Sequence, residues 1–324
     1  MACGKDEPGI AAGAVAGRGL KVALFTDETG WHTRQLQAAL RARGAEGRCI
    51  DLADCRIDTT AAWHGLVIPG FGRELPDAAL VRGIAGGSFE QVTKRLGVLH
   101  ALRELGVAIY NDARAIERSV DKSMTSLLLH AAGVATPPTW ALESAALAQR
   151  LVTRESAAGH ALVLKPLFGS QGKGLQRVGR VDGMHRALPA LKAYGQLAYL
   201  QRYVPAQQQP GFDWRVLVVG GRAVTAMRRI SDHWVHNVAQ GARCEPAVLS
   251  DELATLAERA AAALAMDYAG IDLIPTPDGP QVLEVNGVAA WQGLQRVTRF
   301  NIAALLVADL LERRLPQSGA VRRA

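Results

Sequence analysis

Apolar and polar positions along residues 19–117 switch between a strand pattern and a helix pattern. The apolar run LKVALFT at 20–26 predicts a buried strand, and the spacing over 33–43 predicts a helix that ends at a glycine. Further strands are predicted at GRCIDL and GLVIPG. A helix is predicted over 90–106, before the short strand VAIYN. Because strands and helices alternate, we expect a parallel, doubly wound α/β lobe.

The pattern changes after this lobe. A helix is predicted over 120–134, and the prolines of TPPTW then favour extended chain. The next apolar run, HALVLKP, leads through the glycine-rich LFGSQGKG into another strand. We expect a helix around 183–193 and then a strand at LAYLQRYV.

Two hairpins and two helices are predicted in the last third of the chain. The first hairpin, DWRVLVVGGRAVTAMRRIS, should turn at Gly220 and Gly221. A helix over 250–266 follows, with Ser250 as its N-cap. The second hairpin is AGIDLIPTPDGPQVLEVNG, whose turn is TPDGP. A closing helix is expected over 301–313.

Composition narrows the class of ligand. The 324 residues are 49% hydrophobic and 21% charged, as in ordinary soluble globular proteins. The 37 basic and 30 acidic residues give a formal charge of +7, which favours anionic ligands such as nucleotides, phosphates or polycarboxylates. The basic residues are scattered and only 5% of residues are aromatic, so a nucleic-acid stacking surface is not expected.

The cysteines and the apolar runs indicate a compartment. Cys3, Cys49, Cys55 and Cys244 show neither CxxC spacing nor a histidine grouping suited to zinc, so we expect free thiols in a reducing compartment. No apolar run has the length of a signal sequence core or a membrane span. These features predict a cytoplasmic protein with no membrane partner.

The strand VLEVNG places polar groups among apolar ones. Glu284 and Asn286 are two residues apart and therefore project from one face of the strand. Asp272, in the other strand of the hairpin, should lie across from or near that face. Such an oxygen cluster suits Mg²⁺ or Mn²⁺ with phosphates and water as further ligands. The alternative is a solvated strand face.

The loop LFGSQGKGL follows a lysine at the end of an apolar strand. Burial of the Lys165 ammonium would be costly without an anion. Gly169, Gly172 and Gly174 allow the loop backbone to approach phosphates closely. The spacing is neither a Walker A motif nor GxGxxG, and a flexible surface loop is the alternative.

Charged residues recur in two other places. Lys122 stands in the first turn of a predicted helix, where a solvated lysine is the simpler interpretation. Asp213 and Arg215 share one face of the first hairpin. Arg228 and Arg229 close the return strand and project to opposite faces, so only one of them should point at a site. A charged edge strand is the alternative for each.

Taken in order, these motifs resemble the ATP-grasp superfamily. DKSMT, LKPLFGSQGKG, LQRYV, DWRV, the arginine-ended strand and DYAGIDLI…VLEVNG are most similar to those of the RimK-like carboxylate–amine ligases, which include α-L-glutamate ligases. The resemblance implies an α/β (α+β) fold with an N-terminal doubly wound lobe and two further lobes that grip ATP between them. The implied organisation is a disordered tail 1–18, an N-terminal domain 19–117, a central ATP-grasp subdomain 118–200, a C-terminal ATP-grasp subdomain 201–315 with the metal site, and a tail 316–324.

The resemblance also implies roles for single residues. The implied ATP-binding residues are Lys122, Lys165, Gly169, Ser170, Gln171, Gly172, Lys173, Gly174, Gln201, Arg202, Tyr203, Val204, Asp213 and Arg215. Asp272, Glu284 and Asn286 are the implied metal ligands, and Lys165, Arg229 and Asn237 the implied catalytic residues. Arg202 stands where relatives often carry glutamate, which changes a side chain more than a backbone contact to adenine.

The implied activity is ATP-dependent amide formation. A carboxylate attacks the γ-phosphorus to give an acyl phosphate and ADP, and an amine then displaces phosphate. Relatives suggest glutamate or another amino acid as the amine, with a cofactor, small molecule or protein terminus as the carboxylate, and a homodimer or homotetramer. Two alternatives are an inactive nucleotide-binding regulatory module and a kinase without an amine acceptor.

The acceptor cannot be carried over from relatives. The chain departs from them at Val235 and His236 and at IPGFG in the first lobe. Arg73, Arg82 and Glu90 in that lobe are candidates to face the substrate.

Overall fold

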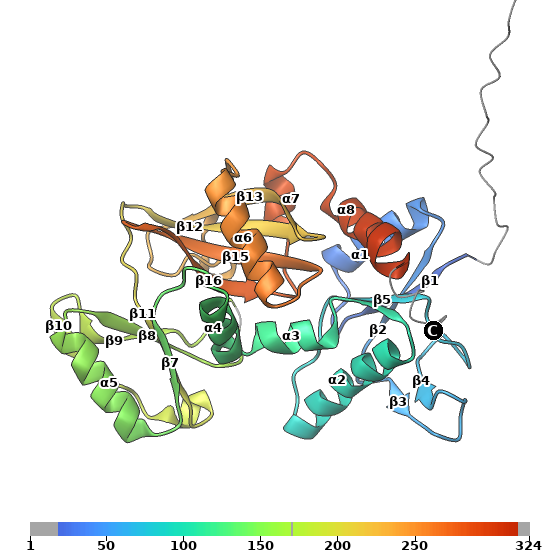
Figure 1. The fold of residues 1–324 in the computed structure, drawn as a ribbon, viewed down its shortest axis with the longest axis horizontal. Coiled ribbons are helices and arrows are strands. Elements are labelled where there is room, and N and C mark those ends of the chain that lie inside the picture. The colour runs from blue at the N-terminus through green and yellow to red at the C-terminus, as the bar shows by residue number, and fades with distance from the viewer. Residues whose placement is uncertain (1–18, 170, 317–324) are drawn as a thin grey trace, which may run out of the picture.

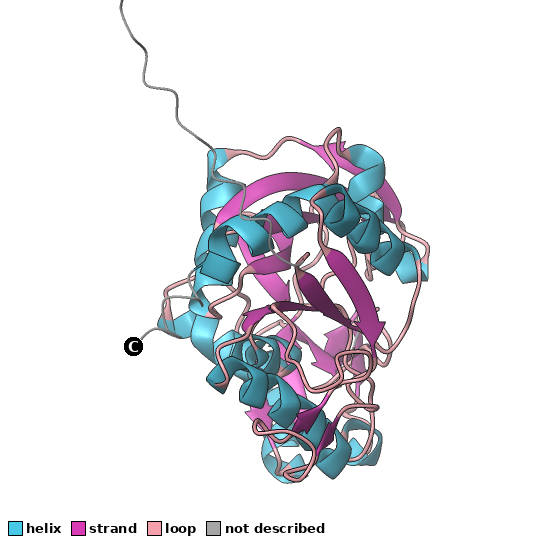
Figure 2. Cartoon of the chain, turned by 90° about the vertical axis from the view of Figure 1, so that its right-hand side faces the viewer, coloured by secondary structure: helices cyan, strands magenta, loops and turns pink. Residues whose placement is uncertain are grey.

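The computed structural model describes residues 19–169 and 171–316. Its N-terminal domain is a four-stranded parallel sheet in the order β2-β1-β5-β6. The elements are β1 (Lys21–Phe25), α1 (Trp31–Ala42), β2 (Glu46–Ile50), β5 (Ala78–Val81), α2 (Phe89–Glu104) and β6 (Ala108–Tyr110), with a separate antiparallel pair of β3 (Arg56–Ile57) and β4 (Leu66–Val67). Side chains of α1 and α2 pack on opposite faces of the sheet. The predicted doubly wound lobe is confirmed, and Figure 2 shows helices on both sides of the strands.

A second sheet is antiparallel and lies at the lower left of Figure 1, at the end of the molecule away from the N-terminal domain. The chain reaches it through α3 (Ala113–Val120) and α4 (Lys122–Ala131). Its strands, in the order β10-β9-β8-β11-β7, are β7 (Thr139–Leu142), β8 (Ala161–Lys165), β9 (Gln176–Val181), β10 (Met184–Arg186) and β11 (Ala198–Arg202). Helix α5 (Ala145–Ala157) covers one face. The opposite face is left to line a pocket.

The predicted helix around 183–193 is wrong. Asp182 and Gly183 both have positive φ, 49° and 80°, and they turn the chain from β9 into β10. A proline at position 189 then lacks the N–H that a helix interior needs. Only a 3₁₀ turn forms in this segment, at Leu191–Tyr194. Turn chemistry therefore overrides the apolar spacing.

The third sheet is antiparallel in the order β14-β13-β12-β15-β16. Its elements are β12 (Gly211–Val219), β13 (Arg222–Ser231), a 3₁₀ turn (Val238–Gln240), β14 (Arg243–Ala247), α6 (Asp251–Ala263), β15 (Tyr268–Thr276), β16 (Gly279–Asn286), α7 (Gln292–Val297), α8 (Ile302–Ala308) and a π-helical end (Asp309–Arg314). Both predicted hairpins are confirmed, the first with φ of 58° and 80° at its two turn glycines. Ser250 caps α6 as expected, because its hydroxyl accepts from the Leu253 N–H.

The two faces of this third sheet differ in what they bury. One face packs its apolar residues against α6. The other face is apolar at one end, where it meets α1, α7, α8 and the N-terminal sheet, and polar at the other end. Figure 1 shows α8 lying beside α1, so α8 joins the N-terminal domain to the third sheet. The polar end of the face is where the candidate site lies.

Among the described residues, no helix combines the length and apolarity that a membrane crossing requires. Cys49, Cys55 and Cys244 are free thiols, as predicted. Cys3, Ser170 and the predicted tail residues 1–18 and 317–324 lie outside the described residues.

Candidate active site

A pocket lies between the polar end of the third sheet and the face of the second sheet that α5 does not cover. Most of the predicted nucleotide-binding residues line it, and they come from α4, β8, β11, β12 and two loops. The lining residues are Lys122, Val163, Lys165, Pro166, Gly169, Gln171, Gly172, Lys173, Leu175, Gln201, Arg202, Tyr203, Val204, Asp213, Arg229, Trp234, Val235, His236, Asn237, Asp272, Ile274, Leu283 and Glu284.

A β-bulge in the second hairpin brings the predicted metal ligands together. From the turn outward, Leu273 pairs with Val282, but Asp272 pairs with Glu284, so Leu283 is an extra residue on β16. Without that extra residue, Asp272 would pair with Leu283 and Glu284 would face the other side of the sheet. The bulge therefore creates the shared face. Its other effect is that Leu283 and Glu284 both line the pocket.

Asn286 completes the predicted oxygen cluster. It pairs with Gly270, and its side-chain nitrogen lies 3.4 Å from an oxygen of Asp272. The same nitrogen donates to the Gly270 carbonyl at 3.2 Å. The three predicted ligands thus stand on one face of the two paired strands, as the sequence indicated.

Two arginines cross the same face and pair with its carboxylates. Arg215 donates to both oxygens of Asp272, at 2.7 Å and 2.7 Å. Arg229 binds both oxygens of Asp213, at 2.7 Å and 2.6 Å, and also approaches Asp272 to 3.0 Å. Arg228 points the other way, to Glu245 at 3.1 Å. This confirms that only one of the adjacent arginines faces the pocket.

Burial and charge shift the pKa values of this cluster. Burial alone would raise the pKa of Asp272, but Arg215 and Arg229 outweigh it and hold that pKa below its usual range. Burial raises the pKa of Asp213, although Arg229 opposes the rise. The pKa of Arg229 lies above its ordinary value because Asp213 and Asp272 outweigh its desolvation. Asp272 and Arg229 are therefore held in their charged forms by their partners, whereas burial disfavours the charged form of Asp213.

Two lysines, one at the end of β8 and one at the start of α4, approach the cluster. Lys165 donates to the Gln201 side-chain oxygen at 2.6 Å, and burial lowers its pKa to about 8. Lys122, at the start of α4, donates to the carbonyls of Leu167 and Gly169 at 3.3 Å and 2.8 Å, and lies 3.8 Å from Glu284. Both ammonium groups therefore stand where an anion in the pocket would meet them.

The glycine loop closes one side of the pocket and meets the loop that follows β13. A Cβ at Gly172 would lie 2.7 Å from Asn237 Oδ1 and 2.7 Å from Val235 Cγ1, so only glycine allows this approach. Gln240 donates to the Gln171 carbonyl at 3.2 Å. The contact places Asn237 beside the glycine loop.

The pocket also has an apolar part that the sequence motifs do not indicate. Val163, Leu175, Ile274 and Leu283 line it from three strands and the end of the glycine loop. Trp234 stands nearby at 6.0 Å from Tyr203, measured between ring centroids, and Arg177 lies over both rings. Val163 and Ile274 could have been found by alternation, since each lies two residues from a predicted site residue. Trp234 carries no such signal.

His236 also lines the pocket and is buried. Its Nδ1 lies 3.9 Å from an oxygen of Asp213, and its Nε2 has no hydrogen-bond partner within the described residues. Burial, with help from Arg229, lowers the pKa of His236 to about 4. The imidazole is therefore neutral near pH 7 and adds no charge to the cluster.

The donor set fits a hard divalent cation. Asp272, Glu284 and Asn286 offer only oxygen to such an ion, which is what Mg²⁺ or Mn²⁺ prefers. Asp272 already accepts from two arginines, but a carboxylate has about four lone-pair sites and can serve an ion as well. No group of three His, Cys, Asp or Glu side chains that could hold a metal ion occurs in the described part of the chain, so a cation site here depends on the Asn286 amide as well as on the carboxylates.

Several predicted site residues, Asn286 among them, are not in the lining of the pocket. Arg215 lies behind it on Asp272, and Gly174 is at the far end of the glycine loop, where its carbonyl accepts from Tyr194 at 2.9 Å. Arg82 donates to the Ala289 carbonyl at 2.9 Å, whereas Arg73 borders a separate hollow in the N-terminal domain. Glu90 is exposed in the first turn of α2.

Two family models match the chain along almost its whole described length. A RimK PreATP-grasp domain matches residues 20–116, and a RimK-like ATP-grasp domain matches residues 119–310.

Curated relatives are similar over most of their own length. The tetrahydromethanopterin:α-L-glutamate ligase of Methanosarcina acetivorans is 31% identical over 88% of this chain and 97% of its own. A probable α-L-glutamate ligase of Thioalkalivibrio sulfidiphilus is 27% identical over 94% of this chain and 99% of its own.

Solved structures share the fold. The ATP-grasp ligase PsnB with its minimal precursor, Mg and ADP has a TM-score of 0.65 at 21% identity, covering 91% of this chain and 98% of that one. A RimK-domain ATP-grasp protein of Sphaerobacter thermophilus has a TM-score of 0.62 at 21% identity, covering 90% of this chain and 99% of that one. Matching models over both domains, together with the 31% identical relative, show that the chain belongs to the RimK-like ATP-grasp family and is an ATP-dependent ligase.

Proposed function

We propose that this chain joins an amino acid, with glutamate the best candidate, to the carboxylate of a small molecule, cofactor or protein terminus. The observation that carries the proposal is the shared face of Asp272, Glu284 and Asn286 opposite Lys122 and Lys165. Carboxylates alone would repel a triphosphate, and lysines alone would not hold a metal ion. The two sets together suit a nucleotide with its cation.

The pocket residues have separate tasks in this proposal. Lys165 and Lys122 bind phosphate oxygens of ATP, and the glycine loop closes over them. The apolar part of the pocket, with the backbone of Arg202 and Tyr203, receives the base, and Asp213 faces the ribose. When bound, Mg²⁺ on Asp272, Glu284 and Asn286 supplies charge neutralisation on the phosphate chain.

Arg229 is the residue proposed to act on the reacting groups. Its guanidinium lies between Asp213 and Asp272, so it is already oriented before any substrate binds. A fixed cation at this place stabilises the negative charge of the transferred phosphoryl group and of the acyl phosphate. Asn237, held beside the glycine loop, is placed to contact the same groups. The reaction then depends on positioning and charge rather than on a protein nucleophile.

Glutamate is proposed from the relatives' names and from charge. Relatives from both an archaeon and bacteria are named α-L-glutamate ligases. The net charge of +7 suits an acidic amine or a polyanionic acceptor. An inactive module is not favoured, because all three metal-ligand positions carry oxygen donors.

The test is product formation by the purified chain. ADP release should require Mg²⁺, an amine and a carboxylate acceptor together, with glutamate compared against aspartate, glutamine and lysine. Acceptors should include a pterin carrying a carboxylate side chain and peptides ending in glutamate. The expected product gains the mass of one glutamyl residue. ATP binding without ADP release from any acid–amine pair would contradict the proposal, and a stable phosphorylated product would identify a kinase instead.

A further inference from the structure

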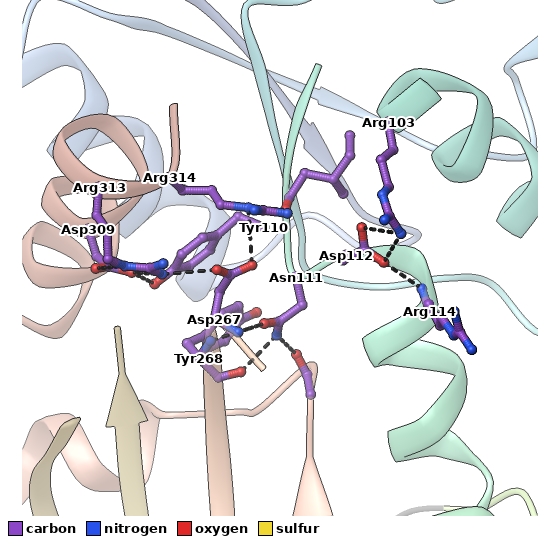
Figure 3. Close-up of polar contacts among 12 residues, drawn as sticks. Arg103, Tyr110, Asn111, Asp112, Arg114, Asp267, Tyr268, Asp309, Arg313 and Arg314 are labelled. Carbon is purple, nitrogen blue, oxygen red and sulfur yellow. Dashed lines mark hydrogen bonds and ion pairs between the residues drawn. The ribbon is translucent and has the colours of Figure 1, made fainter. Parts of the chain in front are cut away.

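A polar network, buried at Tyr110 and Asn111 and partly exposed at its arginines, joins the N-terminal domain to the third sheet (Figure 3). None of its residues lines the pocket. Tyr110, the last residue of β6, donates its hydroxyl proton to Asp309 at 2.6 Å. Arg313 and Arg314 extend the network to Asp267, just before β15. Asn111, the residue after Tyr110, is fully buried and makes a different set of contacts.

The Asn111 amide uses its full hydrogen-bonding capacity. Its nitrogen donates to the carbonyls of Tyr268 at 2.7 Å and Gly287 at 2.6 Å. Its oxygen accepts from the backbone N–H groups of Asp267 at 2.7 Å and Tyr268 at 3.0 Å. The side chain thus acts as a peptide group placed between the open ends of β15 and β16.

These contacts lie at the end of the hairpin that carries the metal-ligand positions. The last pair of the ladder is Gly270 with Asn286, and the Asn111 contacts begin at the next residue, Gly287. Gly287 is also closely packed, since a Cβ there would lie 2.6 Å from Ser119 Oγ. The backbone that carries Asn286 is therefore held by the N-terminal domain on one side and α3 on the other.

We propose that Asn111 is a positioning residue for the divalent-cation site, and this rests on the proposed function. By bridging Tyr268 and Gly287, it fixes the spacing of β15 and β16 where pairing ends. That spacing sets how the donors of Asn286 and Glu284 stand relative to Asp272. A partner behind a metal ligand typically changes metal affinity by about 10–100-fold when it is lost.

The test compares Asn111→Asp with Tyr110→Phe in the full chain. Asn111→Asp keeps the shape and one acceptor but removes both donors, so the Tyr268 and Gly287 carbonyls lose their partner. Tyr110→Phe removes one hydrogen bond of the same network and leaves Gly287 untouched. Mn²⁺ affinity is measured by electron paramagnetic resonance in the presence of a non-hydrolysable ATP analogue, and the melting temperature of each variant is recorded alongside.

We expect Asn111→Asp to weaken Mn²⁺ binding by about tenfold, and Tyr110→Phe to change it by less than about twofold. A second variant approaches the same backbone from the other side. Gly287→Ala should also weaken Mn²⁺ binding, because the new methyl group displaces the end of β16 from Ser119. If Asn111→Asp does not fold, Gly287→Ala still tests the proposal.

Other outcomes would overturn the assignment. Equal Mn²⁺ affinity in the wild type, Asn111→Asp and Gly287→Ala would show that the contact is structural only. Equal losses in Asn111→Asp and Tyr110→Phe would show a general effect of weakening the network. If the wild type binds no Mn²⁺ with the nucleotide analogue, the metal site itself is wrong and this inference is wrong with it. Mn²⁺ binding by a wild type that forms no amide would overturn only the ligase assignment.

Discussion

The pocket and the network around Asn111 are both polar and buried, yet they satisfy their polar groups in different ways. Each hydrogen-bonding position of the Asn111 amide has one partner. In the pocket, Arg229 is shared between two carboxylates and Lys165 has its pKa lowered to about 8 by burial. The network is complete within the chain, whereas the pocket keeps charges that a ligand can still bind.

This difference indicates where substitutions should act. In the network, the loss of a contact should lower the free energy of unfolding. It should leave the turnover of ATP unchanged unless it affects Gly287. In the pocket, a lost charge should reduce turnover more than it reduces stability.

The largest effect is expected for Glu284→Gln. The side chain lines the pocket and loses a formal charge that a cation needs, so kcat/KM should fall by at least about 10²–10³-fold, the scale of losing one fixed charge-stabilising group. The melting temperature should stay close to that of the wild type, since the Lys122 contact is long at 3.8 Å. Steady-state ADP release measures the effect. Glu245→Gln, on β14 of the same sheet and away from the pocket, is the matched control, and equal activity in the two variants would contradict the metal-site assignment.

The next effect is expected for Arg229→Lys. Lysine keeps the charge but cannot bind both oxygens of Asp213, so the free energy of unfolding should fall by about 1–3 kcal/mol. Turnover should fall as well. Arg228→Lys is a control one residue away, and its partly exposed pair with Glu245 should cost less than about 1 kcal/mol. Urea unfolding compares the two variants. A larger loss from Arg228→Lys would reverse our assignment of the two arginines.

A smaller effect is expected from pH on ATP binding. The pKa of Lys165 is about 8 in the free protein, below its ordinary 10.5, and a bound triphosphate should raise it again. Between the free and bound values, the complex holds more protons than the free protein, so affinity must fall as pH rises. We expect ATP binding about tenfold weaker at pH 9 than at pH 7, with proton uptake.

Calorimetric titration in buffers of different ionisation enthalpy measures this proton uptake. Lys165→Arg, which stays charged over this range, should bind with little pH dependence between pH 7 and pH 9. An unchanged pH dependence in that variant would assign the proton to another group.

The smallest effect on turnover is expected for Tyr110→Phe. The hydroxyl bond to Asp309 is lost while the ring keeps its stacking on Tyr268. We expect the free energy of unfolding to fall by about 1–3 kcal/mol, with kcat and KM for ATP unchanged, because Tyr110 is not among the residues that line the pocket. A loss of turnover without a loss of stability would show that the network acts on the site through Tyr110 as well.

Local chemistry made much of the fold predictable from the sequence. The glycine pair at 220–221 defines one hairpin turn, and Ser250 marks the start of α6. The residues at 183–193 show the limit, because apolar spacing suggested a helix where Asp182 and Gly183 turn the chain back. Spacing is a weaker signal than a turn that only a few residues can adopt.

The candidate site was predictable as a set of residues but not as a geometry. Alternation identifies Glu284 and Asn286 as neighbours on one face, yet the pairing of Asp272 with Glu284 depends on the bulge at Leu283. No feature of the local sequence predicts that extra residue. Asn111 could not be found in this way either, because its partners lie more than 150 positions along the chain.

One measurement tests the central claim most directly. Crystals of the wild type with Mn²⁺ and a non-hydrolysable ATP analogue should show anomalous scattering from Mn²⁺ at the shared face of β15 and β16. The account predicts a peak within coordinating distance of oxygens from Asp272, Glu284 and Asn286, and of the phosphate chain. A nucleotide bound with its manganese elsewhere, or with no manganese at these three side chains, would contradict it.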